Sequence, residues 1–478
     1  MKRILWPGIV MIALLLLAGC REAAEPPAEA ATVTVPTATA RPSATAVATR
    51  TPFTPSATPD SVLQVTEDDL RGVTVRFWHP FTDDSAALMR QLAADFNEQN
   101  QWGIRVSVFS QGSSATLQER FVESVQSGEG APHLVAAPLL LLHDWHVQGW
   151  LVPAEPYLRH AQWGWDAEML AGLDAFVLTQ HQNPAGTQLS MPLSWQANVL
   201  FYNQGWAREL GFEEAPATFA DFQAQACAAQ EALLADDDRD NDGTGGYIAS
   251  RDADALLSWL AAFGYDDLPE APGDAYQFAT REGEASFTAL RQMTDDGCAW
   301  VSRLPTPYDY FAERMALFYS GSTRDIFVQE QAMAFTGNED DWIVLPYPAA
   351  EGDSPLLVNG NGAAIVAGSP PEQMAAWLYL NYLLEARNQA LFAIASGSYP
   401  VQQGAWTWLE VYANQHQPWG LPPAWMNPRF SPPLFHNWLV VGNVLADAGW
   451  ELYQPFTTVE RVPAILEMLD SMIAEIIQ

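Results

Sequence analysis

The chain has 478 residues, of which 22 are Lys or Arg and 57 are Asp or Glu, so its formal net charge is −35. A surface this acidic repels the phosphates of nucleic acids, which excludes a nucleic-acid-binding protein. The only lysine is Lys2, which lies in the segment that we assign to a signal peptide in the next paragraph. The rest of the chain therefore has no lysine for a phosphate loop, a Schiff base or a Ser-Lys pair, and these kinds of chemistry are excluded. Because 49% of the residues are hydrophobic and 12% aromatic, we expect two or three folded, domain-sized units.

The first residues have the pattern of an export signal. Lys2 and Arg3 precede an apolar run that ends at Leu17, which is short for a membrane-spanning helix. The tetrapeptide that ends in Cys20 resembles the lipobox of bacterial lipoproteins, in which cleavage before the cysteine is followed by its lipidation. We therefore expect a signal peptide over residues 1–19 and a protein anchored by lipid to the outer face of the bacterial cell membrane. An ordinary signal with a chance cysteine is the alternative.

Residues 20–71 carry the lipidated cysteine and a segment rich in Ala, Thr and Pro. Such a composition cannot bury a core, so we predict a disordered tether. Two further cysteines, Cys227 and Cys298, remain in an exported chain, where a disulfide between them is favoured. Two buried thiols are the alternative.

The hydrophobic pattern predicts that the folded part begins as an α/β domain. Apolar residues alternate in strands that begin near Val73 and Ile104, and a short apolar strand spans Leu134 to Ala137. Helical spacing recurs between these strands, in one helix capped near Thr82 and another through Phe121. The spacing of the strands suits βαβ units and a parallel sheet, whose ligands sit beyond the carboxyl ends of the strands.

Four more elements are predicted further along the chain. Thr218 and Asp221 have the spacing of a capping box and begin a helix that runs through Leu233. A strand follows at residues 342–346, and helices are expected at residues 372–384 and 459–477.

An acidic loop has the first half of an EF-hand pattern, with alternate carboxylates and a glycine, Gly243, at the sixth place. The twelfth place holds Ala249 instead of a bidentate Glu, although Asp252 or Asp254 could substitute. We state a structural calcium site as a hypothesis, with a solvated acidic loop as the alternative; no other cofactor is expected. Its proposed ligands are Asp236, Asp238, Asp240 and Asp242.

From about residue 72 onward, the chain resembles an extracellular solute-binding protein of the maltose-binding-protein-like kind, the sugar-binding component of ABC importers. The segments that carry the resemblance follow the family's order, although His133 stands where the family usually has Asp. They include VTVRFW at residues 73–78, VQSG through PHLV at 125–135, GWLVP at 149–153, MP through FYN at 191–203, PATFADF at 216–222, NGNG at 359–362 and GSYP at 397–400.

This resemblance implies a two-lobed α/β fold in which each lobe is a sheet flanked by helices and the lobes close on a ligand. Lobe 1 would comprise residues 72–190 plus 345–394, and lobe 2 residues 191–344 plus 395–478. The chain would cross near residues 189–195, return near 342–346 and cross again near Ala395. A carbohydrate or other small neutral solute, an ABC permease and the membrane are the implied partners, and we expect a monomer.

The resemblance also places candidate ligand-binding residues, since rings can cover the apolar faces of a sugar while polar side chains bond its hydroxyls. Asn359 and Asn361 could instead serve a glycine-rich turn, Trp425 and Phe435 could belong to the core, and Arg324 could pair with Asp325. The candidates are Trp78, His79, Gln111, Ser113, Trp195, Gln196, Asn198, Ser320, Ser322, Arg324, Asn359, Asn361, Tyr399, Trp425 and Phe435.

We expect no catalysis, but two other functions remain open. The many acids and tryptophans would suit a secreted glycoside hydrolase that uses paired carboxylates. A surface sensor or adhesin could bind sugar without import.

Overall fold

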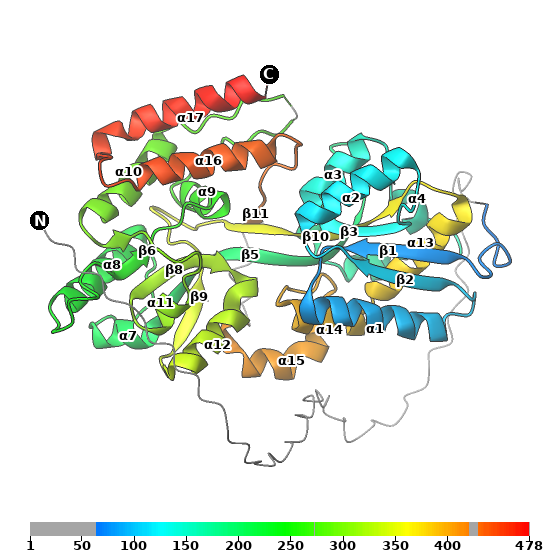
Figure 1. Ribbon diagram of the computed structural model, residues 1–478, viewed down its shortest axis with the longest axis horizontal. Helices are drawn as coiled ribbons and strands as arrows, with labels where there is room; N and C mark the ends of the chain where they lie inside the picture. The colour runs from blue at the N-terminus through cyan, green and yellow to red at the C-terminus, as the bar shows by residue number, and fades with distance from the viewer. Residues whose placement is uncertain (1–63, 272, 420–428, 478) are drawn as a thin grey trace, which may run out of the picture. The chain divides into compact units, whose positions relative to one another are not determined.

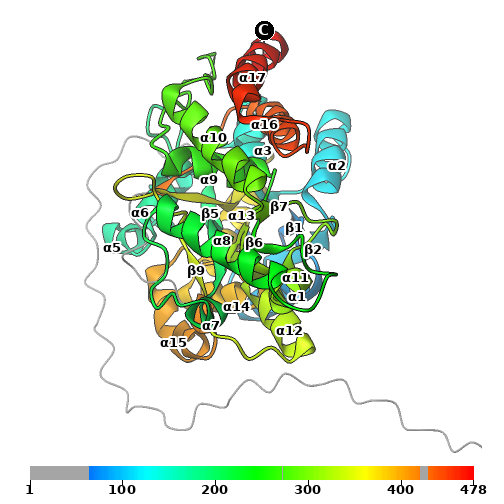
Figure 2. The same cartoon turned by 90° about the vertical axis from the view of Figure 1, so that its left-hand side faces the viewer.

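In the computed structural model of the protein, the described residues are 64–271, 273–419 and 429–477 (Figures 1 and 2). Their strands form one sheet in the order β2-β1-β3-β10-β5-β8-β6-β7, with β4 and β11 on β10 and β9 on β5. The strands are β1 Thr74–His79, β2 Arg105–Ser110, β3 Leu134–Pro138, β4 Leu151–Val152, β5 Met191–Asn203, β6 Gly245–Ile248, β7 Ala299–Trp300, β8 Ala316–Ser322, β9 Trp342–Leu345, β10 Leu356–Val366 and β11 Arg429–Phe430.

Strands β1 to β4 make a first strand group. Here β1 pairs in parallel with β2 and with β3, as the βαβ spacing predicts. Helix α1, Asp83–Gln99, begins directly after Thr82, and α2, Ser114–Ser127, follows β2. Most of their apolar residues at helical spacing are buried, which confirms the predicted helices, although the Thr82 side chain makes no capping hydrogen bond.

Strands β6 to β9 make a second strand group, in which β6 pairs in parallel with β7 and β8. The capping box that begins α8, Phe219–Leu234, is formed as predicted: Thr218 Oγ1 accepts from the Asp221 N–H at 3.2 Å, and Asp221 Oδ2 accepts from the Thr218 N–H at 3.0 Å. The strand at 342–346 is also found, as β9.

Two long antiparallel strands connect the groups (Figure 1). The first half of β5 pairs with β10, and its second half pairs with β8 and β9. β10 continues to β3 and β4 of the first group. We expected the chain to return to the first group near residues 342–346, in β9. However, β9 pairs with the end of β5 that lies in the second group. The chain returns along β10 instead, about ten residues later.

Helices cover both faces of the sheet. In Figures 1 and 2, α16 and α17 lie side by side next to α10. Besides α1, α2 and α8, the α-helices are α3 Leu139–Val147, α4 Glu155–Leu158, α5 Ala167–Ala171, α6 Ala175–Gln180, α7 Gln204–Glu209, α9 Ala253–Ala262, α10 Arg281–Asp295, α11 Tyr308–Ala312, α12 Ile326–Thr336, α13 Pro370–Leu383, α14 Ala386–Ser396, α15 Trp406–Gln415, α16 Trp438–Leu452 and α17 Val462–Ile476.

In the part of the chain that the structure describes, the hydrophobic core has three clusters. The largest runs without a break from Phe77 in the first group, through Trp195 on β5, to Tyr319 in the second. A second cluster joins α8, α9, α16 and α17, and a third lies around Phe121 and Trp145. All residues of β5 except Gln196 and Asn198 are buried, so apolar packing holds this strand where it joins the two groups. Within the described residues, no helix has the length and apolarity needed to cross a bilayer.

Candidate functional site

A cavity of about 660 Å³ lies beside the connecting strands β5 and β10. Its size is that of a small-molecule site. The first strand group contributes the beginnings of α1, α2 and α3, and the second contributes the beginnings of α9 and α16. Its lining includes Phe81, Thr82, Ser113, Gln118, Leu139, Gln180, Gln196, Asp254, Arg324, Asn359, Asn361, Pro433 and Trp438.

Five of the predicted ligand-binding residues meet in this cavity: Ser113, Gln196, Arg324, Asn359 and Asn361. The pairing of β5 with β10 sets Gln196 directly opposite Asn359, so their side chains are neighbours on the same ladder. Ser113 is the N-cap of α2, and its hydroxyl accepts from the Thr116 N–H at 3.1 Å.

Arg324 belongs to a short 3-10 helix, Thr323–Asp325, after β8. Its Nε donates to the Ser396 carbonyl at 3.3 Å, while the guanidinium is exposed and lines the cavity. Ser322 does not reach the cavity lining. It caps this 3-10 helix: its Oγ accepts from the Arg324 N–H at 3.3 Å, and its own N–H donates to Asp325 Oδ2 at 2.8 Å.

The aromatic candidates Trp195 and Tyr399 do not line the cavity; they belong to the core. Trp195 is 2% exposed and donates from Nε1 to the Pro400 carbonyl, and Tyr399 is fully buried and donates to the Trp419 carbonyl. Their ring centroids are 4.7 Å apart. Trp78 is half-buried and packs against the third core cluster. These three aromatic residues therefore serve packing, which the spacing of residues in the sequence does not reveal.

His79 and Asn198 also have structural partners. His79 is fully buried, and its Nδ1 accepts from the Phe81 N–H at 3.1 Å. Burial, reinforced by Arg90, lowers the pKa of His79 to about 4. Asn198 Nδ2 donates at 2.9 Å to both Ser258 Oγ and the Tyr347 hydroxyl.

The remaining candidates lie elsewhere. Gln111 accepts from Arg120 at 2.9 Å. Ser320 shares a 2.7 Å hydrogen bond with the Tyr247 hydroxyl and lines a second cavity of about 880 Å³ inside the second strand group. Phe435 is half-buried outside the first cavity. Trp425 lies outside the described residues.

Asp254 is one of the cavity-lining residues that were not among the predicted ligand contacts. It lies in the first turn of α9, and its Oδ2 accepts from Asn359 Nδ2 at 2.9 Å. Burial, and after it the neighbouring Asp252, raises the pKa of Asp254 to about 6. The position of Asp254 shortly after β6 was a usable signal, because ligands gather at the carboxyl ends of parallel strands.

The acidic loop gives no support to the calcium hypothesis. Asp236 Oδ1 accepts from the Asp238 N–H at 2.7 Å, and Asp238 Oδ1 accepts from the Asp240 N–H at 3.0 Å. The carboxylates thus hold their own turn, an ordinary use of Asp in loops. Among residues 64–271, 273–419 and 429–477, no three His, Cys, Asp or Glu side chains are grouped so that they could hold a metal ion. Asp242, which was a proposed calcium ligand, joins no such group. Asp254, which could have substituted at the twelfth place, lies in the cavity beside β5 and β10.

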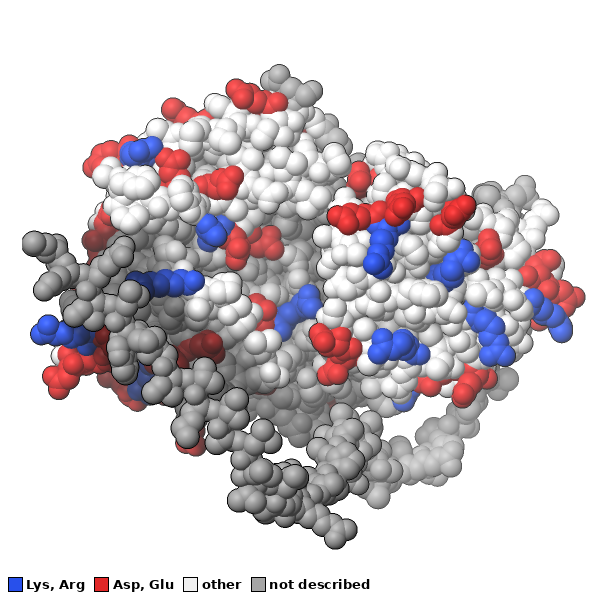
Figure 3. All heavy atoms as spheres, viewed as in Figure 1, with Lys and Arg blue, Asp and Glu red and all other residues white. Residues whose placement is uncertain are grey.

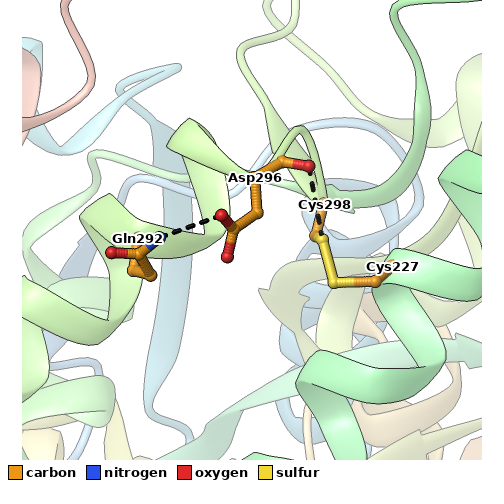
Figure 4. Close-up of a disulfide and its surroundings, with 4 residues drawn as sticks. All are labelled: Cys227, Gln292, Asp296 and Cys298. Atoms are coloured by element: carbon orange, nitrogen blue, oxygen red, sulfur yellow. Dashed lines mark hydrogen bonds between the residues drawn. A yellow bond between two sulfur atoms is a disulfide. The ribbon is translucent and has the colours of Figure 1, made fainter.

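The predicted disulfide is confirmed. Cys227 on α8 is bonded to Cys298, which precedes β7, across 71 residues of sequence (Figure 4). The bond ties the helix that covers the second strand group to the edge of that group.

The sequence matches the family of bacterial extracellular solute-binding proteins over residues 91–415, and the chain belongs to this family. The resemblance found in its motifs is therefore confirmed, and the family is extracytoplasmic. A comparison with curated proteins finds no match.

Solved structures share the fold. The sugar-binding protein MalE from Xanthomonas citri is 20% identical with a TM-score of 0.71, covering 85% of this chain and 97% of its own. The cyclic alpha-maltosyl-1,6-maltose binding protein from Arthrobacter globiformis is 18% identical with a TM-score of 0.68, covering 84% and 99%. UgpB from Mycobacterium tuberculosis, solved with glycerophosphocholine, is 14% identical with a TM-score of 0.65, covering 84% and 98%. These likenesses confirm the two-lobed α/β fold.

Proposed function

We propose that the protein binds a carbohydrate in the cavity beside β5 and β10 and delivers it to an ABC importer. The observation that carries the proposal is that both strand groups line this cavity, on the two sides of the strands that join them. A ligand that contacts both sides binds the closed arrangement more tightly than an open one. The difference between these two binding free energies is the amount by which the ligand stabilises the closed arrangement. The names of the solved relatives, which include maltodextrin-type binders, support a sugar.

The cavity has the mixed character that a sugar needs. Amide and hydroxyl groups from Ser113, Gln118, Gln180, Gln196 and Asn361 can bond sugar hydroxyls. Apolar side chains face the same space, and these include Phe81, Leu139, Leu434 and Trp438. They can cover the C–H faces of the rings.

The lobes are proposed as the sequence suggested, residues 72–190 plus 345–394 and residues 191–344 plus 395–478, with one change. Ala349 bridges to Thr218, and the Ala350 N–H donates to the Ala262 carbonyl. These contacts support assigning the stretch before β10 to lobe 2.

Anchoring is part of the proposal. Signal peptide 1–19, lipidated Cys20 and a tether fit a binder held near its permease, although residues 1–63 lie outside the described part. The tether is proposed to end before residue 64 instead of at 71, because Val65 and Leu70 are buried in the largest core cluster. We propose a monomer that performs no catalysis.

The direct test is a melting-temperature screen of the whole chain against neutral mono- and oligosaccharides. At least one sugar is expected to raise the melting temperature without being consumed. Gln196→Ala should then weaken its binding about tenfold in calorimetry, since a ligand hydrogen bond is lost. Gln148→Ala, an exposed glutamine outside the cavity, is the matched control. If no sugar shifts the melt, the proposal fails; release of cleaved sugar would indicate a glycoside hydrolase instead.

A further inference from the structure

We propose that the ligand is a sugar that carries a basic amine, and that Asp254 binds its ammonium group. This inference rests on the proposed function and names the ligand class of the same cavity. It departs from the neutral solute that the sequence suggested.

The geometry starts with three hydrogen-bond acceptors on adjoining elements. Asp254 on α9 uses Oδ2 to accept from Asn359 Nδ2, which leaves Asn359 Oδ1 as an acceptor. Gln196 faces Asn359 across the β5–β10 ladder. Asn359 Oδ1 and Gln196 Oε1 are both buried, and neither has a hydrogen-bond donor in the described part of the chain. This wall of the cavity therefore has more acceptors than donors.

The charge of the wall is also uncompensated. Asp254 takes part in no ion pair within residues 64–271, 273–419 and 429–477, whose ion pairs all lie elsewhere. Among the described residues of the lining, Arg324 is the only basic one, and it is exposed, bonded to the Ser396 carbonyl and adjacent to Asp325. A half-buried carboxylate without a neighbouring cation carries a desolvation cost, so a ligand that supplies a cation is favoured.

An ammonium group matches these acceptors better than a hydroxyl does. It has three donors and no acceptor, whereas a hydroxyl donates only one hydrogen. A hydrogen bond between an ammonium and a carboxylate is also roughly twice as strong as a neutral one.

The pH dependence follows from the same groups. Burial raises the pKa of Asp254 to about 6. Asp252 precedes it at the N-cap of α9, the Tyr347 hydroxyl lies close by, and Arg324 lines the same cavity. Above pH 6 the carboxylate is mainly ionised and binds the ammonium. As the pH falls through about 6, protonation of Asp254 removes the attraction, so the affinity for an amine decreases.

The experiment compares matched sugars by calorimetry on the whole chain. The probes are α- and β-linked glucose disaccharides, the corresponding 2-amino-2-deoxy disaccharides and their N-acetyl derivatives, at pH 7.5 and pH 5. We expect an amine to bind at least tenfold more tightly than its neutral and acetylated counterparts at pH 7.5, with most of that preference lost at pH 5. Asp254→Asn, which keeps the size of the side chain, should remove the preference while neutral sugars still bind. Asp252→Asn, changing the exposed neighbour, should retain most of it.

The outcomes separate the two proposals. If neutral sugars bind as tightly as amines, or if Asp254→Asn retains the preference, the amine inference is wrong and the sugar-binding proposal stands. If no member of any pair binds but a neutral sugar of the melting-temperature screen does, the amine inference is wrong and the sugar-binding proposal stands; if no sugar of either set binds, both proposals fail. A thermal melt of each variant shows whether a lost preference reflects unfolding.

Discussion

Arg429 and Asp174 illustrate how single residues fix the connection between the strand groups. The Arg429 guanidinium makes two hydrogen bonds to Asp174, at 3.0 and 3.1 Å, and the side chains are only 8% and 19% exposed. The same guanidinium lies 4.7 Å from the Phe176 ring centroid and 5.7 Å from that of Trp195. The pair thus ties β11 to α6 beside β5.

Arg429→Gln is expected to lower the free energy of unfolding by about 3 kcal/mol, because Asp174 would keep a largely buried charge without its partner. Denaturant unfolding measures the change. Arg71→Gln is the control, since its ion pair with Asp68 is 77% and 84% exposed and should contribute less than about 1 kcal/mol. If both substitutions lowered the free energy of unfolding equally, the Arg429–Asp174 pair would not have the stabilising role inferred from its burial.

His79 gives a pH prediction at the same scale. Its pKa is lowered to about 4 in the folded state, whereas the unfolded chain has the ordinary value near 6.5. Between these values the unfolded chain binds the proton and the folded chain does not. The free energy of unfolding should therefore decrease as pH falls, by about 3 kcal/mol from this group between pH 7 and pH 4.

The measurement is the difference between wild type and His79→Asn, since Asn can still accept from the Phe81 N–H. The wild type should lose about 3 kcal/mol relative to the variant over this pH range. Taking the difference removes the contribution of buried carboxylates such as Asp470, whose pKa is raised by burial and which titrate in the opposite sense. Parallel pH curves for the two proteins would show that His79 is not the source.

Residue by residue, the candidate site was only partly predictable. Gln196, Asn359 and Asn361 were identified, because the resemblance located the strands that join the lobes. Trp195 and Tyr399 lie in the core and not in the cavity lining, and the sequence alone does not distinguish an aromatic residue that packs in a core from one that contacts a ligand. Asp254 was missed, since its place in the wall depends on contact with β10, which lies 105 residues away in sequence.

At the scale of elements, the disulfide joins α8 to the segment before β7. Closing a loop of 71 residues restricts the unfolded chain and is worth about 4 kcal/mol. The double variant Cys227→Ala, Cys298→Ala should lose a comparable free energy of unfolding, measured by denaturant titration. Reductant should lower the melting temperature of the wild type and leave the double variant unchanged. A wild type insensitive to reductant under unfolding conditions would contradict this.

Local patterns predicted the elements well. Alternation gave β1 and β2, helical spacing gave α1 and α2, and the capping box at Thr218 set the beginning of α8. These signals act over a few residues, so sequence suffices. The place where the chain returns between the strand groups was put near 342–346, whereas β10 makes the connection. Both segments are apolar and extended, and only their pairing distinguishes them.

At the scale of the whole molecule, the net negative charge affects the stability of the fold. Acidic and basic side chains are scattered over the face in Figure 3, so the net charge of −35 is not confined to one patch there. Self-repulsion of this charge opposes folding and is screened by salt. Raising NaCl from about 20 mM to about 500 mM at pH 8 should raise the melting temperature by at least about 2 °C. The increase should shrink at pH 5, closer to the sequence pI of about 4.3; an equal effect at both pH values would exclude self-repulsion as its cause.

The sequence by itself determined the class of the protein: the motifs in family order, the βαβ beginning, the paired cysteines and the acidic, nearly lysine-free composition. These are properties of the chain and of short segments, so they require no knowledge of distant contacts. The tertiary structure alone decided which polar residues face the cavity and which aromatic residues fill the core. It placed Asp254 against Asn359 and Gln196, and it used the carboxylates of the acidic loop to hold their own backbone. Such choices depend on the pairing of β5 with β10 and on burial, which arise only when the chain is folded.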